Sequence, residues 1–306
     1  MTRTFSIEDE TSHLKTVIVG TATDRGELQM YNPTVAHHDR QGTLPNDQDL
    51  TEQVEGLCRT LKQYGVEVLR PDNVPGVLQT FVRDLGFVIG DTFFWSNLKR
   101  EKRKKEQQGI RSVIDGLGIT QKSIPKEISI EGGDVVLAKG KVFVGVGNRS
   151  DRRRTSKEAV DYLRGELTGR DIIEVIINAS DDRDDDPKTH VLHLDCAFQP
   201  VGSEHAVLFE EGFVGPPEQI MDLIGNENLI RVSGQEMFQM YPNLFSISPE
   251  TIISAPTFSS LNLKLRGLGI NVLEVAYEEI AKLGGLFRCS TLPISRSTLP
   301  RTRPTQ

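Results

Sequence analysis

The sequence predicts a single-domain α/β protein built from small repeated units. Across its 306 residues, short runs rich in β-branched and aromatic residues alternate with amphipathic helical stretches. The order strand, strand, helix, strand recurs about five times, at intervals of roughly 50 to 60 residues. No linker rich in Pro, Gly and Ser divides the chain. We therefore expect one domain over residues 1–294 and a disordered tail over residues 295–306, which are rich in Ser, Thr, Arg and Pro.

The expected strands are the segments in which β-branched and aromatic residues cluster. They are Thr16–Gly20, Val66–Leu69, Phe87–Ser96, Asp134–Gly147, Ile172–Ile177, Val191–Phe209, Leu244–Ala255 and Asn271–Ala276. We expect helices in the amphipathic stretches between them, at Leu50–Tyr64, Lys99–Ile114, Ser156–Leu167, Pro216–Ile224 and Ser259–Leu268. The clearest hairpin joins Asp134–Leu137 to Val142–Gly147, because Gly140 in the turn can adopt a positive φ.

Composition excludes several classes of protein. The 36 basic and 43 acidic side chains give a net charge of −7, which argues against a general nucleic-acid binder. No apolar run approaches the roughly 20 residues that span a bilayer, and Met1–Glu10 lacks the pattern of a secretory leader. Cys58, Cys196 and Cys289 include no CxxC pair, which argues against a disulfide framework and a structural zinc site. We expect a cytoplasmic protein without metal, cofactor or membrane contact, and a homodimer is left open.

Two charged runs are first interpreted as solvated surface. Lys99–Glu106 reads KREKRKKE, and its interleaved glutamates favour an exposed helix face over a polyanion site. Asp181–Asp186 reads DDRDDD and lacks the glycine and the distant glutamate of an EF-hand loop. It is expected as an exposed, flexible acidic loop.

Four short segments place reactive side chains where a structural strand would not need them. In Val191–Phe198, a strand would put His193 and Asp195 on one face. Glu131-Gly132-Gly133-Asp134 enters the hairpin with a carboxylate on each side of a glycine pair, and Asp84 precedes a buried strand. Cys289 follows a glycine pair at the head of a short final strand. Each segment alone also has a purely structural interpretation, and only their combination indicates a site.

The residue types narrow the chemistry of such a site. A cysteine and a histidine together indicate nucleophilic catalysis with proton transfer. Several carboxylates near a thiolate would raise its pKa, unless the substrate is a cation that neutralises them. A guanidinium group meets this requirement, because it is planar, permanently charged and matches carboxylates in bidentate fashion.

Together these motifs resemble the guanidino-group-modifying superfamily of arginine deiminases, dimethylarginine dimethylaminohydrolases and amidinotransferases. The resemblance rests on Arg83-Asp84, EGGD from Glu131, HLD from His193 and GG…RCSTLP around Cys289, and it extends back to the strand Leu14–Gly20. It implies the pentein fold, a pseudo-five-fold α/β propeller of ββαβ units around a central active site.

The resemblance also implies a role for each residue. Cys289 would attack the guanidinium carbon, and His193 would protonate the departing amine and later activate water or an acceptor amine. Asp84 and Asp195 would hold the guanidinium nitrogens, with Asp195 also beside His193, and Glu131 would pair with His193 or the substrate. Candidates for further substrate binding are Arg103 and Arg149, toward an α-carboxylate, and Asp134.

The leading hypothesis is a cofactor-free hydrolase of arginine or an N-substituted arginine that gives a citrulline-type product. Its partner is a small cationic guanidino compound. The sequence departs from arginine deiminases in having Arg288 before the nucleophile, where these commonly have His, and Leu78 in place of an asparagine. Alternatives are an amidinotransferase, an arginine dihydrolase that gives ornithine, and a non-catalytic interaction protein on the same scaffold.

Overall fold

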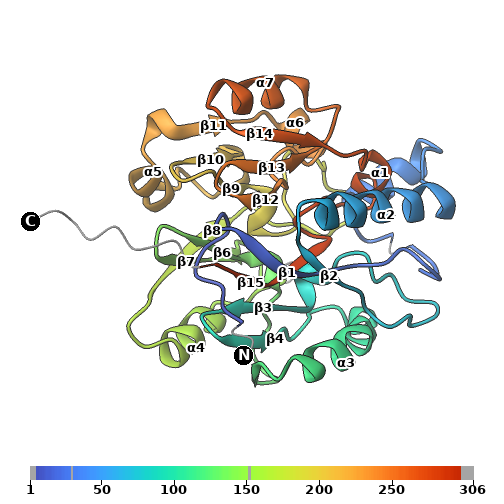
Figure 1. The fold of residues 1–306 in the computed structure, drawn as a ribbon, viewed down its shortest axis with the longest axis horizontal. Helices are drawn as coiled ribbons and strands as arrows, with labels where there is room; N and C mark the ends of the chain where they lie inside the picture. Colours follow the sequence, from blue (N-terminus) through green and yellow to red (C-terminus); the bar gives the residue numbers. More distant parts are fainter. Residues whose placement is uncertain (1–4, 29, 151–152, 298–306) are drawn as a thin grey trace, which may run out of the picture.

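Five three-stranded sheets surround a common centre in the computed structural model, which describes residues 5–28, 30–150 and 153–297 (Figure 1). In each sheet two antiparallel strands pair, and a third strand lies parallel to the second of them. A parallel neighbour requires a crossover connection, and a helix between the second and third strands supplies it. The structure therefore has the expected five ββαβ units.

The first sheet joins the two ends of the described chain. Its strand β1 (Leu14–Val19) pairs antiparallel with β15 (Thr291–Arg296) and parallel with β2 (Glu67–Leu69). Two helices, α1 (Pro33–Arg40) and α2 (Asp47–Gln63), connect β1 to β2. Since β15 continues through residue 296, the expected start of the tail at 295 is too early. Residues 298–306 of that tail lie outside the described residues.

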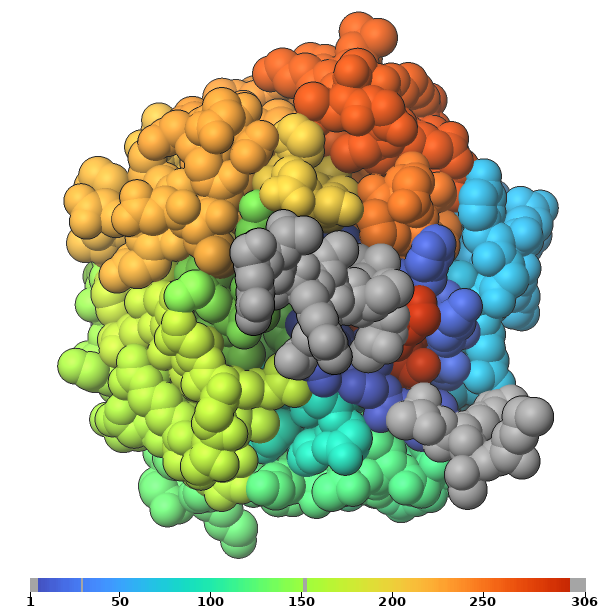
Figure 2. All heavy atoms as spheres, turned by 60° about the vertical axis from the view of Figure 1, so that its left-hand side comes forward, coloured from blue at the N-terminus to red at the C-terminus, as the bar shows by residue number. Residues whose placement is uncertain are grey.

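The other four sheets follow in chain order. Their strands are β3 (Gly86–Ile89), β4 (Thr92–Trp95), β5 (Thr120–Ser123), β6 (Val135–Ala138), β7 (Lys141–Gly147), β8 (Asp171–Ile177), β9 (Phe198–Val201), β10 (His205–Leu208), β11 (Leu229–Arg231), β12 (Phe245–Ser248), β13 (Thr251–Ser254) and β14 (Asn271–Glu274). Their helices are α3 (Gln107–Leu117), α4 (Glu158–Glu166), α5 (Glu218–Ile224), α6 (Gly234–Phe238), α7 (Ser259–Gly267) and α8 (Glu278–Ala281). Figure 1 shows α2, α3, α4, α5 and α7 on the outside of the ring, and Figure 2 shows successive segments as sectors around the molecule.

The outer helices cover the ring with one apolar face each. In α2, Asn46 caps the first turn by accepting a hydrogen bond from the Asp49 amide. The same helix buries Leu50, Val54 and Leu61, which recur at helical spacing. The hydrophobic core thus lies between the sheets and this outer layer. Within the described residues, no helix combines the length and the apolar character needed to cross a bilayer.

Three strand assignments differ from expectation. The strands β5 and β11 were not predicted, because β5 reads TQKS and is mostly exposed, and β11 has only three residues. The segment before Phe198 is not a strand. It forms a 3₁₀ turn, η4 (Leu194–Cys196), closed by hydrogen bonds from the Cys196 and Ala197 amides to the carbonyls of His193 and Leu194.

Polar residues occupy the same place in every unit, immediately before its first strand. The 3₁₀ turns η1 (Val82–Leu85), η3 (Gly132–Asp134) and η4 precede β3, β6 and β9 and carry or adjoin Asp84, Glu131 and His193. Asn243 precedes β12 and Cys289 precedes β15. Backbone hydrogen bonds join these segments, for example from the Arg83 amide to the Cys289 carbonyl (3.1 Å). The repeated topology therefore brings one buried polar residue from each unit to the centre.

Candidate active site

His193 lies between two carboxylates at the centre of the ring. Its Nε2 donates to Glu131 Oε2 at 2.8 Å, and its Nδ1 lies 3.5 Å from Asp84 Oδ1. All three residues are buried. Burial by itself lowers the pKa of His193, but Asp84, Asp134 and Glu131 outweigh it and raise that pKa to about 10. The imidazole is therefore protonated at neutral pH and can act as a proton donor.

The Glu131 carboxylate contacts the three cationic side chains of His193, Arg154 and Arg103. Besides His193, its Oε2 accepts from Arg154 at 3.1 Å and lies 3.5 Å from Arg103 Nη1, while its Oε1 accepts from the Lys99 amide at 3.2 Å. Burial raises the pKa of Glu131, and Arg154, His193 and Arg103 together bring it well below its usual range. Glu131 is thus an ionised carboxylate that fixes the orientation of the His193 ring.

The run KREKRKKE has two faces. Its last six residues form a 3₁₀ helix, η2 (Glu101–Glu106), in which residues three apart share a face. Its lysines are exposed as expected, but Arg103 and Glu106 are buried, so the expectation of a solvated face is wrong at these positions. Arg103 binds both oxygens of Glu106 at 2.9 Å and donates to Asp84 at 2.8 Å. Burial raises the pKa of Glu106 to about 7 despite this pairing.

Arg154, and not Arg149, reaches the site. Arg149 is exposed, and its guanidinium lies 4.0 Å from Asp185 in the acidic loop, so the expectation that it grips the substrate is not met by its position. Arg154 is buried beside Glu131, and its Nε has no hydrogen-bond partner in the described part of the chain. The Arg100 guanidinium stacks 4.4 Å from the centre of the Tyr31 ring, which also lies 5.8 Å from the Arg154 guanidinium.

The acidic loop is also not wholly exposed. Asp181 is buried and accepts a hydrogen bond from Arg100 Nε at 2.7 Å. It lies 3.8 Å from Arg154 Nε as well. The expectation of a flexible, solvated loop is therefore wrong for its first residue, because two arginines at the rim of the site require a counter-charge.

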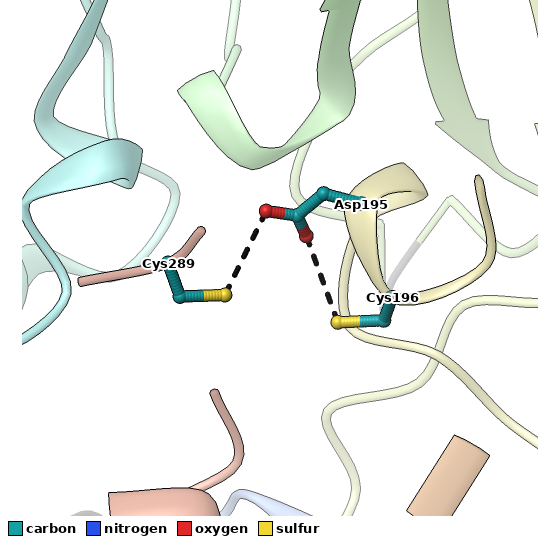
Figure 3. Close-up of side chains that lie close together, drawn as sticks. All are labelled: Asp195, Cys196 and Cys289. Carbon is teal, nitrogen blue, oxygen red and sulfur yellow. Dashed lines mark hydrogen bonds between the residues drawn. The ribbon is translucent and has the colours of Figure 1, made fainter. Parts of the chain in front are cut away.

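Cys289 lines the same cavity as His193, and its backbone is held in place. Its amide donates to Asn243 Oδ1 at 3.1 Å, and its Sγ lies 3.6 Å from Asp195 Oδ2 (Figure 3). Contact with the Cys196 thiol, burial and the Asp195 carboxylate raise the pKa of Cys289 well above its ordinary value. The Cys289 side chain is therefore a neutral thiol, which a bound cation would help to deprotonate.

Asp195 and Asp134 support the site from behind. Asp195 Oδ2 accepts from Arg288 at 2.9 Å, and Arg288 in turn donates to Glu10 (2.7 Å) and the Val135 carbonyl (2.8 Å). Because of the 3₁₀ turn, Asp195 does not share a strand face with His193, and it contacts Cys289 instead.

Asp134 accepts a hydrogen bond from the Leu194 amide at 2.9 Å and from Thr155 at 2.5 Å, so each of its oxygens has a protein partner. Asp134 is not part of the cavity lining described below, and its role in substrate binding stays a prediction.

A cavity connects these groups to the surface. Its polar lining consists of Asp84, Arg103, Arg154, His193 and Cys289, together with Tyr31 and Asn32. Leu78 and Phe81 form part of an apolar wall. Asp84 Oδ1 is buried and accepts no hydrogen bond from the described residues. The cavity thus offers an unsatisfied acceptor beside a thiol and a proton donor.

The glycine pair of EGGD is required by close packing. A Cβ on Gly133 would lie 2.8 Å from both His193 Nδ1 and Asp84 Oδ1. A Cβ on Gly132 would lie 2.1 Å from the Arg83 carbonyl oxygen. Only glycine lets η3 pass this close to the His193 ring.

Two groups of side chains have the composition of a metal site. Asp84, Glu131 and His193 form one, and Asp195, Cys196 and Cys289 form the other. In each group a carboxylate already carries arginine, namely Arg103 and Arg154 in the first and Arg288 in the second. A divalent ion at either group would face these guanidinium charges and compete with them for the carboxylate oxygens, so the arrangement disfavours a metal ion there.

A pentein ring with a thiol, an imidazolium and carboxylates at its centre defines the guanidino-modifying enzymes. The family model described as N,N dimethylarginine dimethylhydrolase, eukaryotic, matches residues 32–296, and the chain belongs to this family. The chain is 32% identical over 248 residues to the uncharacterized protein YkgA of Bacillus subtilis (strain 168), with 80% of each chain covered.

Two further comparisons concern arginine-degrading proteins. The bifunctional arginine dihydrolase/ornithine cyclodeaminase AgrE of Nostoc sp. is 25% identical over 248 residues, and the match covers 80% of this chain but only 33% of that longer protein. The product-bound N-terminal domain of ArgZ, a cyanobacterial arginine dihydrolase, superimposes with a TM-score of 0.79 at 20% identity. That superposition covers 93% of this chain and 99% of the ArgZ domain and shows the shared fold.

Replacing Gly133 by alanine tests the packing beneath His193. The added methyl must push aside the His193 ring or the Asp84 carboxylate, and a displacement of this size costs about 10²-fold in kcat. Gly116→Ala in α3 is the matched control, because its Cβ would meet nothing within 4 Å. Turnover of a guanidino substrate and thermal unfolding are measured for both. Full activity of Gly133→Ala would contradict the described packing.

Proposed function

We propose that the protein hydrolyses arginine or an N-substituted arginine at the guanidinium carbon and releases a citrulline-type product. One observation carries this proposal. The Cys289 thiol, the protonated His193 and the Asp84 carboxylate, whose Oδ1 accepts no hydrogen bond from the described residues, all line one cavity. A nucleophile, a proton donor and an anionic acceptor are the three groups that substitution at a cationic carbon requires.

Binding places the guanidinium against Asp84. Asp84 Oδ2 is taken by Arg103, and Oδ1 remains for a substrate N–H. Arg154 supports an amino-acid substrate, because its buried Nε makes no hydrogen bond within the described residues, lies 3.8 Å from Asp181, and can donate to an α-carboxylate. Arg103 lines the same cavity, but its pairing with Glu106, Asp84 and Glu131 makes it a support for the carboxylates. Leu78 and Phe81 offer apolar contact to an alkyl-substituted guanidinium.

The first half of the reaction forms a covalent intermediate. The cationic substrate offsets the carboxylates that raise the pKa of Cys289, so the thiol releases its proton to solvent when substrate binds. The thiolate adds to the guanidinium carbon. His193 then gives a proton to the departing nitrogen, and an amine leaves with the bonding electrons while the carbon stays attached to sulfur.

The second half restores the enzyme. His193, now neutral and still hydrogen-bonded to Glu131, takes a proton from water as its oxygen adds to the thiouronium carbon. The carbon–sulfur bond breaks, the thiolate leaves, and the new C–OH group gives up its proton to form a neutral ureido product. This proton replaces the one that the Cys289 thiol released when substrate bound. The net change is addition of one water and release of one amine.

Replacing Cys289 by serine tests the nucleophile. A serine hydroxyl is far less acidic and less nucleophilic, and we expect kcat to fall by about 10³-fold or more. Circular dichroism and thermal unfolding show whether the fold is kept. A folded serine variant with full turnover would exclude Cys289 as the nucleophile.

The products identify the reaction. They are analysed by mass spectrometry after incubation with arginine or methylarginines, with and without glycine as acceptor. Citrulline supports hydrolysis, whereas a new guanidino compound formed only with the acceptor indicates amidino transfer. Ornithine and ammonia indicate a dihydrolase, as the names of AgrE and ArgZ describe for those proteins. No reaction with any guanidino compound would contradict the proposal.

A paired substitution separates Arg154 from Arg149. We expect Arg154→Gln to raise KM for arginine about 10-fold to 100-fold, because a hydrogen bond to a charged group contributes about 1.5–3 kcal/mol. A guanidino compound without an α-carboxylate should show a smaller increase. Arg149→Gln, at the exposed position, should leave KM within about twofold. Equal effects of both substitutions, or of one substitution on both substrates, would contradict this assignment.

A further inference from the structure

Two cysteines lie on either side of one carboxylate behind the cavity. Asp195 Oδ2 lies 3.6 Å from Cys289 Sγ, and Asp195 Oδ1 lies 3.6 Å from Cys196 Sγ. The two sulfurs and the carboxylate oxygen all lie within 4.8 Å of one another. Figure 3 shows the two thiols extending toward each other from opposite sides, beneath the carboxylate. Both are free cysteines and both are buried.

One asparagine holds the two cysteine-bearing segments together. Asn243 Oδ1 accepts from the Cys289 amide at 3.1 Å and from the Leu286 amide at 3.2 Å. Its Nδ2 donates to the carbonyl of Asp195, the residue before Cys196, at 3.3 Å. Because Asn243 is fully buried, the segments keep this separation, and side-chain rotation or a small backbone shift can bring the sulfurs to bonding distance.

The two thiols differ in access. Cys289 lines the cavity, and Cys196 is not part of its lining. A small oxidant that enters the cavity therefore meets Cys289 first. In placement, though not in pKa, this matches a peroxide-oxidised thiol with a resolving thiol behind it.

We infer that Cys196 is a resolving cysteine, which forms a reversible disulfide with Cys289 when a peroxide oxidises the site. The bridge itself rests on the placement of the two thiols. Only its effect on turnover, the loss of the free Cys289 nucleophile, rests on the proposed function. Nothing in the hydrolysis proposed above uses Cys196.

The reaction balances with hydrogen peroxide as the oxidant. Cys289 sulfur attacks one peroxide oxygen, the O–O bond breaks, and the departing hydroxide takes up the thiol proton as water. Cys196 sulfur then attacks the sulfenic sulfur of Cys289. Asp195, which already contacts the Cys196 thiol, accepts its proton and passes it to the leaving hydroxide as a second water. Two thiols have lost two electrons and two protons, and one peroxide has become two waters.

Peptide mapping of the oxidised full-length protein tests the bridge without measuring activity. The reduced protein is treated with hydrogen peroxide, free thiols are blocked with iodoacetamide, and a non-reducing digest is analysed by mass spectrometry. We expect a linked peptide pair that contains Cys196 and Cys289 and lacks two hydrogen atoms, while Cys58 carries the block. Dithiothreitol should return both thiols completely.

Two variants complete the experiment. In Cys196→Ser, peroxide should carry Cys289 to sulfinic acid, which dithiothreitol does not reverse. Cys58→Ser is the matched control and should still form the bridge, because Cys58 lies in α2 and contacts Arg70. Absence of the linked peptide in the wild type, or equal irreversible oxidation of Cys289 with and without Cys196, would overturn the inference. If Cys289→Ser keeps full turnover while the wild type forms the bridge, the proposed function fails and this inference stands.

Discussion

The ion pair between Glu131 and His193 is the interaction on which the site depends. Glu131 is completely buried, and its carboxylate is held by His193, Arg154 and Arg103, so side chains from three of the five units meet at one group. Removal of any partner would leave an uncompensated charge in the interior, which is far more costly than the loss of an exposed pair. The same contacts keep His193 protonated and aligned with the cavity.

The ring explains how short segments far apart in the sequence build one site. Each unit enters its first strand at the centre, and at that point it contributes one polar residue: Asp84, Glu131, His193, Asn243 or Cys289. Sequence identity between units is not required, because the topology alone sets the position. Four of these residues act in the proposed reaction. Asn243 forms hydrogen bonds to both the Asp195 and the Cys289 segments. In the proposed reaction, the positive charge of the substrate lowers the pKa of Cys289, which is a neutral thiol when the cavity is empty.

Sequence patterns predict the repeated fold and the reactive residues, because hydrophobic periodicity and short motifs are local. They do not predict which side chain of a charged segment turns inward. Four arginines lie within residues 149–154, three of them described by the structure, and the sequence does not specify that Arg154 is the one that lines the cavity. Arg103 and Glu106 are three apart, a spacing that would have indicated a shared 3₁₀ face. Asn243 has no motif, and the turn at Leu194–Cys196 overrides the strand alternation that paired His193 with Asp195.

Measuring the protonation state of His193 tests whether the ion pair with Glu131 holds a proton on the imidazole. Its imidazole resonances can be followed by NMR through pH 10, with the other five histidines assigned by substitution. The described contacts predict a titration midpoint of about 10, and a marked fall in Glu131→Gln, which removes the negative charge that His193 contacts. A midpoint in the wild type near the ordinary value of 6.5 would contradict the account, because His193 would then lack the proton that the departing amine requires.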